Sequence, residues 1–375
     1  MVSHGFVHPE MLVNNNFRWP VYLEYVGSGF LSVLIFFCIS GYVIGLNYDR
    51  PKLSIKDYLK KRAVRLYPIY IVSIIVCLIV TGGVSFYILA GNLLFLQNFA
   101  PYGHINIPVY INYVTWSLNF EVVYYLLFIA IFFARPRVWV LLLILIAGSI
   151  LAMHASHQYE FASGYINGFY FWMAGLIIAW TAANNNSQER APVHLLSLLF
   201  LHLCQSYLGI GSIALHLVHI YTIDGVNWLF DLPFCVMVIC TLTGKDNTLL
   251  RINKIYCYAL PAALFIYLIL THRLFETERW IVCIIFWILS LAFYFEKRLS
   301  AYLLNKLIYI GHISYGLYLF HVPVAYLVKK VVLIDNPNIE IPVKYALWAV
   351  LTFALAIVLE LKVQPVIKRY FFPKT

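Results

Sequence analysis

The chain has 375 residues, of which 62% are hydrophobic and 11% are charged, and its formal net charge is +10. Soluble domains carry about 25% charged residues, so this composition excludes a soluble enzyme and indicates an all-α polytopic integral membrane protein. The positive charge does not imply a nucleic-acid partner, because Lys and Arg of membrane proteins gather in cytoplasmic loops. The seven cysteines lack metal-site spacing, and most are predicted to pack in apolar runs without disulfides.

Apolar runs follow one another along the whole chain, with no soluble second domain between them. A spanning helix needs about 20 mostly apolar residues, which predicts about ten or eleven transmembrane helices in one domain, 1–375. The run 85–98 is shorter, and we expect a re-entrant or interfacial helix there. The predicted spans lie near residues 28–48, 66–84, 116–134, 138–154, 164–182, 195–221, 227–243, 255–271, 280–295, 307–328 and 343–363.

The distribution of basic residues predicts the topology. If the loop 49–65 is cytoplasmic, alternation of the spans places most of the 26 Lys and Arg residues on the cytoplasmic side. The C-terminus is then cytoplasmic, and Met1 lies outside. An outside start without an apolar signal segment is unusual. We therefore expect a first helix upstream of Met1, missing either because the start is placed too late or because the gene is truncated.

Glu121 lies inside the apolar run 116–134. A carboxylate at membrane depth costs a few kcal/mol or more unless it is paired, so it marks a functional-site hypothesis. Glu121 is predicted either to orient a catalytic partner, to polarise a base or to pair with a buried cation, or else to act as a structural hydrogen-bond acceptor. Trp116, Ser117 and Tyr125 are expected to line a substrate tunnel or to pack around this carboxylate.

Four segments between about residues 30 and 325 carry motifs in a fixed order. They resemble those of the acyltransferase 3 family of membrane O-acyltransferases. The resemblance implies transfer of an acyl group, commonly acetyl, from cytoplasmic acyl-CoA to a hydroxyl of a carbohydrate or glycolipid acceptor, in a bacterial inner membrane. The segments are Phe36-Phe37 with Ser40-Gly41-Tyr42, Arg62 and Arg65 with Tyr67-Pro68, Trp116-Ser117-Leu118 with Glu121, and Ser314-Tyr315 with Tyr318 and His321.

The basic cluster before Tyr67 is a candidate donor site. Acyl-CoA carries several phosphate charges, and Arg suits bidentate phosphate contacts. If this segment is helical, Arg62 and Arg65 share one face. We predict that Lys61, Arg62, Arg65 and Tyr67 bind acyl-CoA as a co-substrate, with no bound cofactor. The alternative is a plain cytoplasmic anchor of the positive-inside type.

Acyl transfer to a hydroxyl needs a base whose pKa lies near neutrality, and His is the natural choice. The resemblance implies that His4 is this base, with His8 as the fallback. His4 would act by direct attack or through an acyl-His intermediate. The family pattern also places an Arg earlier on the same helix, and that position would precede Met1. His321 is predicted to be either a second catalytic residue or a satisfied core residue.

The remaining motif residues are assigned to packing and to the lining of a cavity. Ser40 and Gly41 are expected to allow close helix packing, and Tyr315 and Tyr318 to face one cavity. No carboxylate accompanies the histidines of the run 195–221, so no metal site is predicted. The rival functions are a transporter or flippase of a glycan intermediate, and a catalytically inactive relative.

Overall fold

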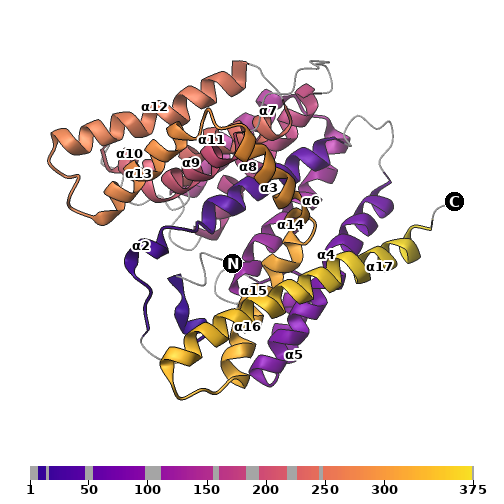
Figure 1. The fold of residues 1–375 in the computed structure, drawn as a ribbon. Coiled ribbons are helices and arrows are strands. Elements are labelled where there is room, and N and C mark those ends of the chain that lie inside the picture. The colour runs from indigo at the N-terminus through magenta and orange to yellow at the C-terminus, as the bar shows by residue number, and fades with distance from the viewer. Residues whose placement is uncertain are drawn as a thin grey trace. The chain divides into compact units, whose positions relative to one another are not determined.

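The computed structural model describes residues 7–13, 17–46, 54–97, 111–154, 160–182, 194–217, 226–244 and 248–373. These residues form helices and no strands (Figure 1). Five of the described helices are long and apolar enough to cross a membrane, or up to six if the bent pair α14 and α15 is one span. The predicted all-α polytopic architecture is confirmed.

Several predicted spans are shorter or less regular than expected. The runs 28–48, 138–154 and 227–243 hold apolar helices that fall below the length of a full span. The run 195–221 is divided at Gly209, whose φ of 65° is left-handed and ends one helix before the next begins. Composition therefore located the apolar helices better than it predicted their lengths.

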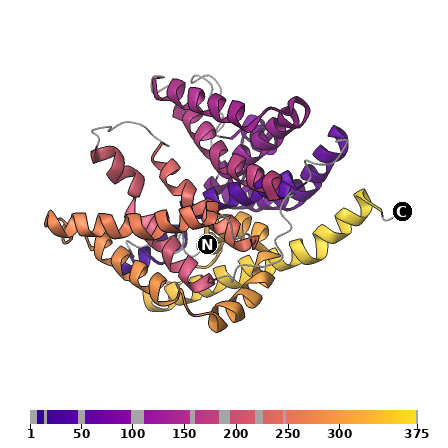
Figure 2. The same cartoon turned by 90° about the horizontal axis from the view of Figure 1, so that it is seen from above.

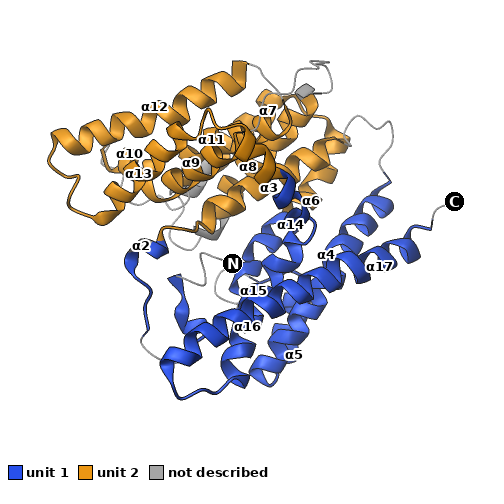
Figure 3. Ribbon diagram, viewed as in Figure 1, with its two compact units in different colours: residues 1–24, 52–122, 305–375 blue, residues 25–51, 123–304 orange. Residues whose placement is uncertain are grey.

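The chain divides into two compact units, which are drawn in different colours in Figure 3. Unit 1 comprises residues 1–24, 52–122 and 305–375, and unit 2 comprises residues 25–51 and 123–304. Helix α6 (Trp116–Ala134) begins in unit 1 and ends in unit 2, and α14 (Arg298–Gly311) begins in unit 2 and ends in unit 1. Unit 1 also contains η1 (Pro9–Met11), α2 (Val21–Glu24), α4 (Ile55–Thr81), α5 (Phe86–Leu93), η2 (Tyr113–Thr115), α15 (Ser314–Val331), α16 (Pro337–Ile357), η5 (Val358–Val363) and α17 (Gln364–Phe371). Unit 2 also contains α3 (Phe30–Gly45), α7 (Val138–His154), α8 (Glu160–Ala182), α9 (Leu195–Leu208), α10 (Ile210–Leu217), η4 (Val226–Asp231), α11 (Leu232–Leu242), α12 (Thr248–Leu270) and α13 (Glu278–Ala292).

Helix α4 begins well before the span predicted at 66–84. The hydroxyl of Ser54 accepts a hydrogen bond from the amide of Asp57, which caps the first turn. At the other end, Gly82 adopts a left-handed φ of 79° and closes the helix. The basic cluster therefore lies inside the first turns of α4, rather than in a loop before it.

The predicted span 307–328 is wrong as a single straight helix, because α14 and α15 meet at an angle of 67°. The break falls between Gly311 and Ser314. The Ser314 hydroxyl donates to the Gly311 carbonyl, at 2.9 Å, and so satisfies a carbonyl at the end of α14. The motif that begins with Ser314 thus forms the first turn of a new helix.

Helix α16 also begins earlier than predicted and leads into a longer helical run. The side chain of Asn336 accepts from the amide of Asn338, and Pro337 occupies the first turn. The segment η5 is a π-helix, and α17 continues directly from it. This run is the yellow helix that ends near the C-terminus in Figures 1 and 2.

Four of the described helices have a proline in their interior, namely Pro68, Pro261, Pro323 and Pro342, and each proline exposes one backbone carbonyl. A proline lacks the N–H that would bond to the carbonyl four residues earlier. In α4, α15 and α12 a buried amide side chain donates to that carbonyl, which is one way in which membrane helices tolerate proline. Gln364 donates to Val64 O before Pro68, Asn112 to Leu319 O before Pro323, and Gln205 to Cys257 O before Pro261, over 2.7, 2.9 and 3.2 Å.

In unit 2, helices α3 and α8 approach each other through glycines. A Cβ atom on Gly41 would lie 1.9 Å from the Trp172 carbonyl oxygen, and one on Gly175 would lie 1.9 Å from the Cys38 carbonyl oxygen. Only glycine leaves room for this contact. The predicted packing role of the Ser40-Gly41 segment is confirmed, with Ser40 itself buried. All seven cysteines are free and buried, as packing residues are expected to be.

In unit 1, the short helix α5 ends beside the middle of α4. The hydroxyl of Tyr67 donates to Leu93 O at 3.0 Å, and that of Tyr70 donates to Asn92 O at 2.9 Å. With a rise of 1.5 Å per residue, Tyr70 lies about 16 Å from the end of α4. This depth favours the re-entrant interpretation of the run 85–98 over the interfacial one.

Candidate functional site

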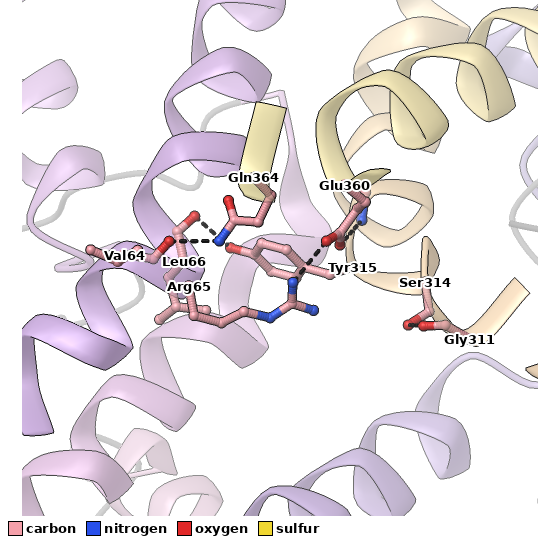
Figure 4. A network of polar contacts seen from close by, with 9 residues as sticks. Val64, Arg65, Leu66, Gly311, Ser314, Tyr315, Glu360 and Gln364 are labelled. Atoms are coloured by element: carbon pink, nitrogen blue, oxygen red, sulfur yellow. Dashed lines mark hydrogen bonds and ion pairs between the residues drawn. The ribbon is translucent and has the colours of Figure 1, made fainter. Parts of the chain in front are cut away.

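Arg65 of the predicted donor site forms an ion pair with a buried carboxylate. Its Nη1 donates to Glu360 Oε2 at 2.7 Å, and the side chain of Glu360 is only 2% exposed (Figure 4). The side chain of Arg65 is 38% exposed. The second carboxylate oxygen, Oε1, accepts from the amide of Gly316 at 3.2 Å. Glu360 therefore contacts both the basic motif on α4 and the Ser-Tyr motif on α15.

Tyr315 makes a second contact between the same two motifs. Its hydroxyl donates to Leu66 O at 3.1 Å, and the guanidinium of Arg65 lies 5.1 Å from the centre of its ring. That distance allows a cation–π interaction. Tyr318, one turn later, contacts η2 and α6 instead, so the two tyrosine hydroxyls bond to different segments.

The other residues of the basic cluster have different surroundings. The guanidinium of Arg62 lies 5.6 Å from the ring centre of Tyr58, one turn earlier on α4. Lys61 is exposed. Lys60 donates to Phe371 O at 2.9 Å, which places a positive charge at the carbonyl end of α17, where the helix dipole favours it. Lys61, Arg62 and Arg65 all belong to α4 and are exposed or half-buried.

Unit 1 contains a buried polar group that comprises Ser117, Tyr318 and Glu121. Tyr318 has a single hydroxyl proton and donates it to Val114 O, so the Ser117 hydroxyl donates to Tyr318, over 2.6 Å. Glu121 follows Ser117 by one turn of α6 and is 3% exposed. Its carboxylate lies close enough to Tyr318 and Tyr58 to interact with both electrostatically.

His321 is buried, with 1% of its surface exposed. Its Nδ1 lies 2.8 Å from Tyr318 O and 3.1 Å from Leu317 O. Carbonyl oxygens only accept, so Nδ1 carries a proton, and whenever the ring is neutral Nε2 holds the basic lone pair. Trp348 donates to the backbone carbonyl of His321 at 2.6 Å and holds this turn against α16. The ring is thus fixed in one tautomer.

The remaining motif residues are placed among aromatic neighbours. Trp116 packs edge-on against Phe120 of its own helix, with ring centres 5.2 Å apart. Tyr67 packs against Phe95 of the segment after α5. Ser40 and Tyr125 are buried in unit 2, whereas Arg65, Ser117, Glu121, Tyr315 and His321 belong to unit 1.

The predicted base His4 lies outside the described residues. The fallback His8 lies just before η1, where its Nδ1 is 3.0 Å from Glu10 Oε1. A carboxylate in this position fixes the orientation of an imidazole, as in catalytic triads. Both side chains are exposed, at 44% and 65%. Within the ranges that the structure describes, no three His, Cys, Asp or Glu side chains are grouped to hold a metal ion.

Sequence reasoning missed Glu360 and most of the polar interior of unit 1. The rule that singled out Glu121 applies equally to Glu360, which lies in the predicted span 343–363. Neutral amides give no comparable signal, because their cost in a membrane depends on partners that the sequence does not reveal. The buried polar residues that were missed include Asn92, Gln97, Asn112, Thr115 and Asn119.

The fold and this polar interior define a polytopic membrane protein with ionisable groups buried among apolar helices. The acyltransferase domain family model matches residues 1–361, which is nearly the whole chain. The chain therefore belongs to the acyltransferase 3 family and is an acyltransferase of the membrane O-acyltransferase type. No curated protein and no solved structure matched it significantly.

Proposed function

We propose that this protein transfers an acetyl group from cytoplasmic acetyl-CoA to a hydroxyl of a cell-surface polysaccharide or glycolipid in a bacterial inner membrane. The observation that carries the proposal is the arrangement in unit 1. There, the half-exposed Arg65 is held at the first turns of α4, and its neighbour Tyr315 lies one turn from the buried group of Tyr318, Ser117 and His321. A cationic entrance for phosphates thus adjoins a polar interior.

The donor would bind through its phosphates to Lys61, Arg62 and Arg65. The guanidinium groups supply planar N–H donors that match phosphate oxygens. The pantetheine arm is long and neutral, so it suits passage between helices towards the polar interior. Tyr67 packs against Phe95 and donates to Leu93, which favours a supporting role for it in the wall of that passage.

In the chemical step, the acceptor hydroxyl attacks the thioester carbonyl. The carbon–oxygen bond forms, the carbon–sulfur bond breaks, and CoA leaves as a thiol. His4 takes the hydroxyl proton and returns it to the thiolate. Transfer through an acyl-His intermediate uses the same groups in two steps. Glu121 and His321 are proposed to stabilise or relay charge, because each is buried beside Tyr318.

The test is transfer of radiolabelled acetyl from acetyl-CoA, using membranes with and without the protein. We expect protein-dependent label in a polysaccharide or glycolipid fraction, and loss of that label in His4→Ala. The fraction that holds the label identifies the acceptor class. Absence of protein-dependent label with acetyl-CoA and with other short acyl-CoA donors would reject the proposal and favour an inactive relative. The family match gives no support to the transporter alternative.

A further inference from the structure

The buried carboxylate of Glu360 has no part in the proposed transfer step, yet it lies at the candidate donor site. It belongs to the π-helix η5, between α16 and α17. Single π-helical turns are rare and occur frequently at functional sites. An ionised carboxylate buried in this way is costly unless its oxygens are paired.

Both oxygens of Glu360 are engaged, and by two different motif segments. Oε2 accepts from Nη1 of Arg65 at 2.7 Å, and Oε1 accepts from the backbone amide of Gly316 at 3.2 Å. The ring of Tyr315 lies against the guanidinium, 5.1 Å from its centre. The carboxylate thus holds the guanidinium from its edge and the ring contacts it nearby, as the close-up in Figure 4 shows. Both constraints favour one guanidinium orientation.

This orientation leaves N–H donors of the Arg65 guanidinium accessible. A guanidinium carries five N–H donors in a rigid fork, and the hydrogen bond to Glu360 uses one nitrogen, Nη1. The side chain is 38% exposed. Fixing such a side chain before the ligand arrives reduces the entropy that binding would otherwise cost.

We propose that Glu360 is the positioning residue of the donor site, because it orients the Arg65 guanidinium so that its exposed edge binds a phosphate group of acyl-CoA. This inference rests on the proposed function, since it assumes a CoA-type donor. Glu360 itself does not touch the donor. The competing explanation is an ion pair that only packs α4 against η5.

The first experiment measures CoA binding to the purified full chain by calorimetry, comparing wild type with Glu360→Gln. The Gln carbonyl can still accept from Gly316, so the change removes mainly the charge beside Arg65. We expect the Kd for CoA to rise about tenfold, which is the effect of weakening one charge-assisted hydrogen bond. The matched control is Glu276→Gln. It breaks another Arg–Glu pair, with Arg273 at 3.8 Å, and should leave the Kd unchanged.

A double-mutant cycle with Arg65→Gln separates positioning from packing. If Glu360 acts through Arg65, the double variant binds CoA no more weakly than Arg65→Gln alone. The unfolding midpoint of each variant shows that binding is compared between folded proteins. Glu360→Gln that binds CoA as tightly as wild type, or more tightly, would overturn the inference, and so would additive effects. A wild-type chain that binds no CoA would instead count against the proposed function itself.

Discussion

Units 1 and 2 are both built from apolar helices, but they bury different kinds of polar side chain. In the described part of unit 2 the fully buried polar groups are neutral, as in the cluster of Ser197 and Ser290, whose hydroxyls lie 3.1 Å apart, whereas the ionisable Asp231 and His202 are only partly buried. In the described part of unit 1, carboxylate, ammonium and imidazole groups are buried as well. These are Glu121, His321, Glu340, Lys344 and Glu360.

This difference distinguishes polar side chains that only stabilise the fold from ionisable side chains that can take part in function. A neutral hydroxyl or amide in an apolar bundle is satisfied by a nearby carbonyl and contributes a modest net stability. A buried charge costs several kcal/mol and needs a specific partner. These buried charges are the reason for proposing that unit 1 holds the chemistry, and the predictions below test that proposal.

The largest effect is expected at the buried pair of Lys344 and Glu340, whose N–O distance is 2.7 Å. Lys344→Ala leaves a buried carboxylate without its cation and should destabilise the protein by about 3–5 kcal/mol. Replacing both residues, with Lys344→Met and Glu340→Gln, should recover most of that loss. Denaturant unfolding in detergent measures both. In unit 2, Ser290→Ala should cost only about 1 kcal/mol, and equal costs for Ser290→Ala and Lys344→Ala would contradict the comparison.

The next largest effect is expected where the helices of unit 2 approach most closely. Gly175→Ala places a Cβ 1.9 Å from the Cys38 carbonyl oxygen and should destabilise by about 3 kcal/mol, since backbone must shift. Gly148→Ala is the control, because its Cβ would lie at an ordinary 3.5 Å from Ile166 Cδ1. Thermal unfolding distinguishes the two. A tolerated Gly175→Ala would show that α3 and α8 pack less closely than described.

Glu121→Gln tests the chemistry of unit 1 with little change in volume. If its charge assists proton transfer, kcat should fall about a hundredfold, which corresponds to about 2.7 kcal/mol in the barrier. The unit 2 control is Thr241→Val. The Thr241 hydroxyl donates to Met237 O of its own helix. The activity of this variant per folded molecule should match wild type. A fully active Glu121→Gln would leave that carboxylate a structural role.

The smallest effects are expected at the amide side chains that donate to carbonyls exposed by helix prolines. Both units contain such amides. Gln205→Leu in unit 2 and Gln364→Leu in unit 1 should each cost about 1–2 kcal/mol, because each removes the donor to an exposed carbonyl. In a Pro261→Ala background the backbone amide can bond to Cys257 O, so Gln205→Leu should cost less there. If Gln205→Leu costs the same in both backgrounds, the Gln205 amide does not compensate for the N–H that Pro261 lacks.

Much of the fold could be predicted from local sequence. The apolar runs located most of the helices, the Ser40-Gly41 motif indicated a close helix contact, and the short run 85–98 indicated a helix that does not span. Helix ends were predicted less well. The Ser54 cap and the break at Ser314 depend on single side-chain hydrogen bonds that average hydropathy does not register.

The candidate site was predicted only in part. Glu121 was singled out because a charge in an apolar run is costly wherever the chain folds, and Arg65 and His321 were singled out because they belong to the family motifs. The partners of these three residues were not predicted. The carbonyls to which Tyr315 and Tyr318 donate could not be read from the sequence, because they belong to α4 and η2.

The sequence by itself determined the helical membrane architecture, the basic cluster and the family motifs, because composition and short spacings act locally. Only the tertiary structure decided which carboxylate pairs with Arg65 and which amides satisfy the carbonyls exposed by Pro68, Pro261 and Pro323. Glu360 is 295 residues from Arg65, and Gln364 is 300 residues from Val64. Contacts at such separation depend on the packing of α4, α15 and the helices after it, and no local pattern in the chain specifies that packing.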